Sequence, residues 1–117
     1  MLFRSVLTSI TTAGAGTYSA AQIATGLIER DPNGAGRTDT TDTAAAILAA
    51  LPHMVSNGDM FQCLLINTAD AAEAITLAGG TGVTIVNVGQ TLAQNESAIL
   101  VFRRTSATTL SLYVIGA

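Results

Sequence analysis

Hydrophobic and polar residues alternate along the last part of the chain. In residues 109–115 (TLSLYVI), three aliphatic residues alternate with Thr109, Ser111 and Tyr113, which is typical of a strand with one buried face. Residues 97–104 (SAILVFRR) precede this run across the short segment TSAT. The two runs therefore predict a β-hairpin.

Three further segments in the middle of the chain have the character of strands. Residues 74–78 (AITLA) and 82–88 (GVTIVNV) flank Gly79-Gly80-Thr81, which predicts a second hairpin. Residues 60–67 (MFQCLLIN) are almost continuously apolar, which predicts a strand covered on both faces. Several short strands of this kind predict a mainly β protein, built as an antiparallel β-sandwich or jelly-roll-like module.

A helical period replaces the strand pattern in residues 43–51, before Pro52. One face of this predicted helix has the larger side chains: Ala44, Ile47, Leu48 and Leu51. The opposite face has only small residues: Thr43, Ala46, Ala49 and Ala50. A helix on the surface of a monomer normally has a polar face, yet residues 43–58 contain no charged side chain. We therefore expect other copies of the chain, or another protein, to cover this helix.

The segments before the helix are polar or ambiguous. Asp31-Pro32-Asn33-Gly34 has the composition of a β-turn, and Thr41 or Asp42 is expected to cap the helix. Residues 18–29 could form a short helix or a strand pair broken at Gly26, and extended structure is favoured.

The start of the chain is expected to form an arm. Residues 1–17 predict an N-terminal strand, over 2–10, followed by a flexible linker. This arm could lie on a neighbouring molecule as easily as on its own body. Residues 18–117 are expected to form a single β-rich domain.

The composition indicates a surface that is largely used for contacts with protein. Charged residues make up 11% of the 117 residues, less than half of the usual share of about 25%. Hydrophobic residues make up 49%, and large exposed apolar patches usually mark interfaces. A compact, weakly charged monomer is the alternative.

Charge and hydropathy argue against two other classes of partner. The net charge is −3, and five arginines without any lysine do not supply the basic cluster that nucleic acid binding needs. The sequence contains no run of about 18 apolar residues, so it predicts no membrane helix. We therefore expect neither nucleic acid nor a membrane as a partner.

Few residues could support catalysis. His53 follows the proline that ends the helix and is expected in a loop, while Cys63 lies in the most apolar strand and is expected to be an inert, buried thiol. One histidine and one cysteine cannot supply the ligands of a zinc site. The sequence predicts no enzyme, no metal and no cofactor.

The charged residues near the turn are explained better by contacts than by metal binding. Asp31, Asp39 and Asp42 lack the spacing of a calcium loop, and Arg37 lies among them as a competing cation. Turn formation, capping and Arg–Asp pairing account for them without a metal. Of Arg103 and Arg104, one is expected to be solvated and the other could pair with an acid across a subunit boundary, where it would add specificity. The predicted oligomer or capsid interface comprises Arg30, Asp31, Arg37, Asp39, Asp42, Ala46, Ala49 and Ala50.

Three stretches of the chain have a familiar pattern: GLIERDPNGAGRTDTTDTAAAILAALP, GDMFQCLLINTADAAEAITLAGGTGVTIV and ESAILVFRRTSATTLSLYVIG. They resemble small structural proteins of tailed bacteriophages, above all capsid decoration proteins, also called cement or head-fibre proteins, and the likeness covers roughly residues 17–116. Asp42 stands where the pattern of those proteins has proline.

The resemblance implies a β-sandwich without catalytic activity or cofactor. Such a protein would assemble as a homotrimer on the outer surface of an icosahedral head, bind the major capsid protein and stabilise the shell. It would occupy the host cytoplasm before assembly and the virion afterwards.

Two other functions are open at this point. A trimeric fibre or tail module that contributes to host attachment would also be rich in β-structure. A small enzyme or ligand-binding domain would need a concave site with converging polar groups, for which the sequence offers no candidates.

The predicted helix generates a test of oligomerisation. Ala46→Glu or Ala49→Glu would bury an unpaired charge at a contact between subunits, which is strongly unfavourable. We expect either variant to lose the oligomeric mass in light scattering while its circular dichroism stays native. A variant with unchanged mass would contradict a contact through this face.

Overall fold

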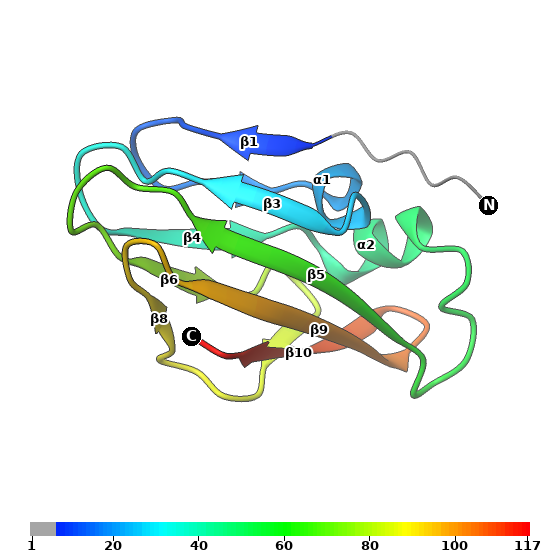
Figure 1. The fold of residues 1–117 in the computed structure, drawn as a ribbon. Helices are drawn as coiled ribbons and strands as arrows, with labels where there is room; N and C mark the ends of the chain where they lie inside the picture. The colour runs from blue at the N-terminus through cyan, green and yellow to red at the C-terminus, as the bar shows by residue number, and fades with distance from the viewer. Residues whose placement is uncertain (1–6) are drawn as a thin grey trace.

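The structure, a computed structural model, describes residues 7–117, which form two β-sheets and two short helices (Figure 1). The protein is therefore mainly β, as predicted. The six-stranded sheet has the order β1 (Thr8–Ile10), β3 (Leu27–Arg30), β5 (Met60–Asn67), β9 (Ser97–Ser106), β10 (Thr109–Ile115) and β7 (Val83–Ile85). The four-stranded sheet has the order β2 (Thr17–Tyr18), β4 (Arg37–Thr41), β6 (Ile75–Ala78) and β8 (Thr91–Leu92).

The chain passes from one sheet to the other after each strand from β1 to β8. Odd-numbered strands up to β9 belong to the six-stranded sheet, and even-numbered strands up to β8 belong to the four-stranded sheet. Strands that return to a sheet in the same direction pair in parallel, as β1, β3 and β5 do, and likewise β2, β4 and β6. Among the described strands, five of the eight pairings are parallel. The prediction of antiparallel sheets is therefore wrong, and both sheets are mixed.

One of the two predicted hairpins forms. β9 and β10 pair in antiparallel fashion, with Leu110 opposite Arg104 and Ile115 opposite Ile99. The other predicted hairpin is wrong, because β6 and β7 lie in different sheets. The chain crosses between them at Gly80, where a Cβ atom would lie 2.5 Å from a backbone oxygen of the β4–α2 connection. Only glycine allows so close an approach of two backbones.

The hydrophobic core draws side chains from both sheets and both helices. In β10, three alternating residues are buried as predicted: Leu110, Leu112 and Val114. Full burial of a large aliphatic side chain contributes about 1.5–3 kcal/mol, so such positions supply the main driving force for folding. The other strands and helices contribute Tyr18, Ile23, Ile28, Ala44, Ile47, Cys63, Leu65, Ile75, Val83, Leu92, Ala98, Leu100 and Phe102.

Helix α2 (Ala44–Ala50) confirms the helix predicted from the period of apolar residues. Its N-cap is Thr43, whose hydroxyl oxygen accepts a hydrogen bond from the Ala46 amide at 3.2 Å. The prediction that Thr41 or Asp42 caps this helix is therefore wrong. The hydroxyl of Thr41 accepts from the amide of Gly80 instead.

Helix α1 (Ala20–Ala24) is a second helix, in a region where extended structure was favoured. The Ser19 hydroxyl oxygen accepts from the Gln22 amide at 3.2 Å, and the Gln22 side chain accepts from the Ser19 amide at 2.9 Å. This reciprocal pair is a capping box, and its spacing is visible in the sequence as Ser19-Ala-Ala-Gln22. Strand β3 follows after Gly26, which has a positive φ of 83°.

At the start of the described chain, β1 pairs in parallel with β3 of the same molecule. The remainder of the predicted N-terminal strand falls in residues 1–6, outside the described residues. Neither helix within residues 7–117 has the length and apolar character needed to cross a membrane.

Candidate functional site

A buried ion pair joins the two sheets. Arg30 ends β3 in the six-stranded sheet, Asp39 lies in β4 of the four-stranded sheet, and neither side chain has exposed surface. The Arg30 Nε donates to Asp39 Oδ2 at 2.7 Å, and Nη2 donates to Oδ1 at 3.2 Å. The contact is bidentate, with two N–H groups of the planar guanidinium bonded to the two oxygens of the carboxylate.

Arg30 uses all five of its N–H groups. Besides the two bonds to Asp39, Nη1 donates to the carbonyl oxygens of Thr12 at 2.9 Å and Asp31 at 2.7 Å. Nη2 also donates to the carbonyl oxygen of Gly14 at 2.8 Å. Arg30 therefore holds the segment between β1 and β2, which the sequence predicted as a flexible linker.

Asp39 accepts two further hydrogen bonds. The amide of Gly16 donates to Oδ1 and the hydroxyl of Tyr18 donates to Oδ2, both at 2.7 Å. A Cβ atom on residue 16 would lie 3.1 Å from both Arg30 Nη2 and Asp39 Oδ1, so glycine lets the backbone come close to the pair. A buried network in which every polar group has a partner makes the interior rigid.

The pair and the tyrosine keep each other in fixed protonation states. Burial alone would raise the pKa of Asp39, but hydrogen bonds from Arg30, Tyr18 and the Gly16 amide outweigh it and hold this pKa below its ordinary value. Burial alone would lower the pKa of Arg30, but the hydrogen bond and charge of Asp39 raise it. Burial, together with the charge of Asp39, raises the pKa of Tyr18. At neutral pH the network is thus a carboxylate, a guanidinium and a neutral phenol.

The structure corrects part of the predicted interface. Arg30 and Asp39 cannot contact another chain, because both are fully buried in their own. Asp42 is half-buried, and its Oδ2 accepts a hydrogen bond from the Ala20 amide of α1 at 2.9 Å. Asp31, Asp39 and Asp42, which were considered together as calcium ligands, do not meet: Asp31 precedes the turn into β4, Asp39 lies within β4, and Asp42 follows it.

The remaining predicted interface residues fall in two places. Asp31 and Arg37 flank the turn before β4, whereas Ala46, Ala49 and Ala50 lie on α2, after β4 has ended. All five retain some exposed surface. The structure therefore does not bring these two groups together, and contact through either group stays a prediction.

The two residues considered for catalysis are placed as expected. His53 is exposed, and its ring lies 5.8 Å from the ring of Phe61. Cys63 is fully buried, and burial raises the pKa of its thiol to about 12. The thiol is therefore protonated at neutral pH, whereas the thiolate is the nucleophilic form.

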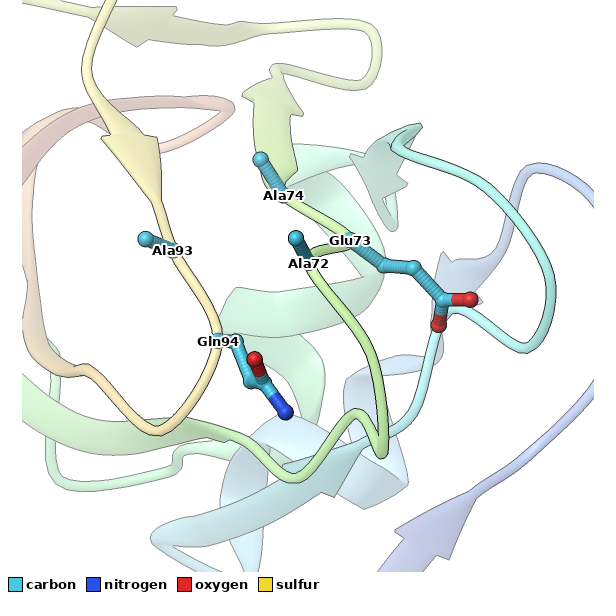
Figure 2. A pocket seen from close by; sticks show the side chains of 5 residues that line it. All are labelled: Ala72, Glu73, Ala74, Ala93 and Gln94. Atoms are coloured by element: carbon cyan, nitrogen blue, oxygen red, sulfur yellow. The ribbon is translucent and has the colours of Figure 1, made fainter.

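A pocket of about 320 Å³ lies between the loop before β6 and the segment after β8 (Figure 2). Its lining consists of Ala72, Glu73, Ala74, Ala93 and Gln94. Figure 2 shows the carboxylate of Glu73 directed away from the other lining side chains. The wall is therefore made mostly of alanine methyl groups, and polar groups do not converge in it as they do in a typical ligand site.

The outer face of the six-stranded sheet has a row of apolar side chains. Strand register aligns Leu27, Leu64, Ile99 and Ile115 across β3, β5, β9 and β10. The exposed fraction is 39% for Leu64, 36% for Ile99 and 50% for Ile115. We call these four residues the apolar row.

Charge is nearly absent around the apolar row. On the outward positions of these four strands, the charged residues are Glu29 and Arg103. The register places them toward opposite ends of the face, with Glu29 beside Ile66 and Arg103 beside Met60, which is 59% exposed. Glu29 lies two residues from Leu27 on the same face and so borders the apolar row, whereas Arg103 lies four residues along β9 from Ile99. Apart from Glu29, the row can exclude water against a matching surface without leaving buried charges unpaired.

The sequence analysis missed this face but contained its signal. The unbroken apolar run in β5 predicted cover on both sides, yet in the single chain only the inward residues, such as Cys63 and Leu65, are buried. Met60 and Leu64 point outward and are exposed. The prediction that β5 is covered on both faces is therefore wrong for a single chain. Because the outward face of β5 has no cover, the apolar row is the candidate binding site.

Comparison of the chain with protein-family models, with curated protein sequences and with solved structures finds no match.

The buried pair generates a prediction about acid stability. Because the pKa of Asp39 is lower in the folded protein, its contribution is fully present above about pH 4 and is lost as the pH falls through the lowered value. Asp39→Asn removes this contribution and leaves Arg30 without its counter-ion, which should cost about 3–5 kcal/mol at pH 7. We expect urea unfolding between pH 7 and pH 2.5 to show a smaller loss of stability in the variant than in the wild type. Equal pH dependence in both proteins would contradict this assignment.

Proposed function

We propose that this protein is a non-enzymatic structural component of a phage virion, which binds the outside of the assembled capsid and stabilises it. The observation that carries the proposal of an assembling protein is the apolar row on the outer face of the six-stranded sheet, which supports association of copies of the chain. Covering this row would release water from apolar surface, which favours association. The likeness of the chain to capsid decoration proteins supports the major capsid protein as the partner of the assembly.

The occupant of the apolar row is a second copy of the chain. Interfaces between permanently associated copies are more apolar than transient ones, and the row has little charge around it. In this proposal the two sheets stack as a β-sandwich whose inner faces form the core. The outer face of the larger sheet then joins copies into a homotrimer, which leaves other surfaces for the capsid.

Binding to the capsid would stabilise the shell by mass action. A protein that binds only the assembled lattice shifts the equilibrium toward that lattice, and the effect grows with the ratio of concentration to dissociation constant. Repetition over many lattice sites multiplies a modest interface. The proposed place of action is the outer capsid surface, after synthesis in the host cytoplasm.

A matched pair of variants tests the oligomer. Leu64→Glu places a charge in the apolar row, whereas Thr38→Glu places the same charge at an exposed position of β4 in the other sheet. We expect Leu64→Glu to weaken self-association at least tenfold in sedimentation equilibrium, since about 1.4 kcal/mol corresponds to a factor of ten. Thr38→Glu should keep the wild-type mass. Association of Leu64→Glu at wild-type strength would reject the apolar row as the contact.

Co-sedimentation with capsids of the phage that encodes the chain tests the function itself. The wild type and Thr38→Glu should pellet with expanded capsids but not with free coat subunits, and Leu64→Glu should pellet less. Electron microscopy of gold-labelled protein should place it on the head. Label on the tail would instead support a fibre or tail module, and no association with particles would reject the proposal.

A further inference from the structure

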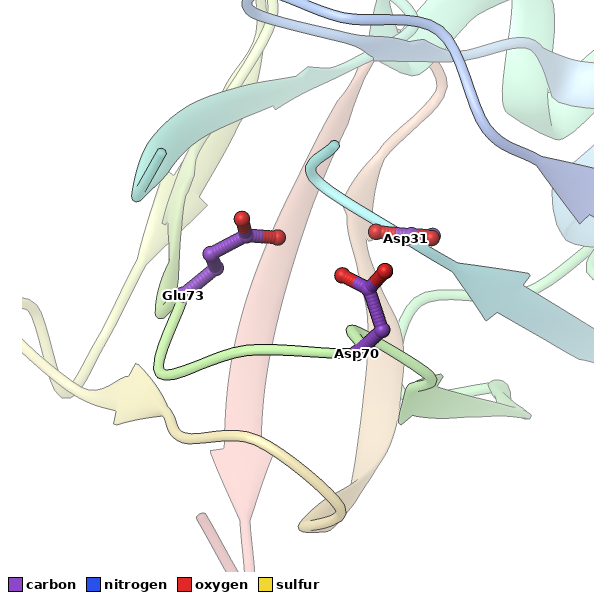
Figure 3. Close-up of side chains that lie close together, drawn as sticks. All are labelled: Asp31, Asp70 and Glu73. Carbon is purple, nitrogen blue, oxygen red and sulfur yellow. The ribbon is translucent and has the colours of Figure 1, made fainter. Parts of the chain in front are cut away.

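Three carboxylates from two separate segments meet at one end of the molecule (Figure 3). Asp31 directly follows β3, while Asp70 and Glu73 lie in the loop between β5 and β6. One carboxylate oxygen of each residue lies within 4.8 Å of the corresponding oxygens of the other two. Such proximity is unfavourable for three negative charges unless a cation lies among them.

One carboxylate oxygen of Glu73 is buried without a partner. Glu73 is only 7% exposed, and its Oε2 accepts a hydrogen bond from the Gly34 amide at 2.8 Å. Its Oε1 is also buried, yet no donor in the described part of the chain reaches it. Figure 3 shows this carboxylate directed toward the space that Asp31 and Asp70 also face. A buried carboxylate oxygen is costly without a donor or a metal ion, so this one points to a missing ligand.

The nearby arginines do not neutralise the cluster. Arg30 directs its five N–H groups to Asp39 and to backbone carbonyls, as described above. Arg37 donates to the carbonyl oxygens of Pro32 and Asn33, both at 3.2 Å. Within residues 7–117, the ion pair with an N–O distance below 4.0 Å is Arg30–Asp39. None of the three carboxylates therefore has an ion-pair partner in the described chain, and the nearest charge effect is that between Arg30 and Asp31.

The loop that holds two of the three carboxylates is fixed in place. Asn67 is fully buried, and its Nδ2 donates to the carbonyl oxygens of Glu73 at 2.7 Å and Leu92 at 3.0 Å. Its Oδ1 accepts from the Ala69 amide at 3.0 Å. The Arg37 amide donates to the carbonyl oxygen of Ala74, which ties this loop to the start of β4. The backbone that carries Asp70 and Glu73 is thus held in place before any ion binds.

We propose that Asp31, Asp70 and Glu73 form a calcium site. Carboxylate oxygens are the ligands of hard cations, and the cluster has no histidine or cysteine that would favour zinc or copper. Calcium accepts six to eight oxygens in flexible geometry, so water can complete the shell on the exposed side of Asp70. Magnesium demands a more regular octahedron and gives up its water reluctantly.

The ion would bind the turn after β3 to the loop before β6. These segments connect strands of different sheets, so the site would add to the links that the Arg30–Asp39 pair and the Asn67–Leu92 hydrogen bond already make between the sheets. The inference departs from the expectation, drawn from the sequence, that the protein has no metal. It is independent of the proposed function, because a monomer could bind calcium equally well.

Calorimetric titration of chelator-treated protein with CaCl₂ at constant ionic strength tests the site. We expect one Ca²⁺ per chain, and a rise in the thermal unfolding midpoint of at least about 5 °C at saturating calcium. MgCl₂ at the same concentration should give less than half of this rise. An equal rise with magnesium would overturn the assignment. The assignment would also fail if calcium up to about 10 mM gave neither heat nor a rise, because this concentration exceeds the dissociation constants of weak extracellular calcium sites.

Two variants of the cluster and one control variant distinguish a built site from surface charge. Asp70→Asn changes an exposed side chain, so it should fold normally and bind calcium at least tenfold more weakly. Glu73→Gln should abolish the calcium-dependent rise of the midpoint. Glu96→Gln, which alters an exposed carboxylate outside the cluster, should behave like the wild type. If Asp70→Asn and Glu96→Gln respond to calcium equally, the ion is adventitious and the proposal fails.

Discussion

The ion pair between Arg30 and Asp39 is the contact on which the rest of the structure depends. It links the end of β3 to the middle of β4, and these strands belong to different sheets. A buried pair is stable only when each remaining polar group is satisfied. Here the carbonyls of Thr12 and Gly14, the amide of Gly16 and the hydroxyl of Tyr18 meet that requirement. The path of the chain between β1 and β2 is therefore set by the same pair.

This constraint explains how a chain with few charges can form mixed sheets. Because successive strands alternate between sheets, tight hairpins cannot join them, and longer connections leave backbone groups that need partners. Polar side chains bind these connections from within, as Arg30, Asn67 and Asp42 do. The charged residues Arg30, Asp39 and Glu73 are thus used inside the molecule. The outer face of the larger sheet carries the apolar row, which is the property that the proposed assembly requires.

The sequence predicted elements with a local signal and missed those that distant contacts decide. The period of residues 43–51 and the alternation in residues 109–115 were sufficient to predict α2 and the β9–β10 hairpin. β4 (RTDTT) has no apolar pattern and becomes a strand because Asp39 is satisfied inside the protein. Arg–Asp pairing was also expected, but Arg30 and Asp39 were assigned to an interface with another chain. Sequence alone does not distinguish a charge pair within a chain from one between chains.

Hydrogen exchange at the Gly16 amide tests the central claim most directly. This amide lies in a loop but donates to the buried carboxylate of Asp39. If the pair holds the two sheets together, the amide should exchange only through global unfolding, with protection equal to that of core amides in β5 and β9. Exchange as fast as that of an exposed loop would contradict the account, because the segment would then open without disturbing the fold.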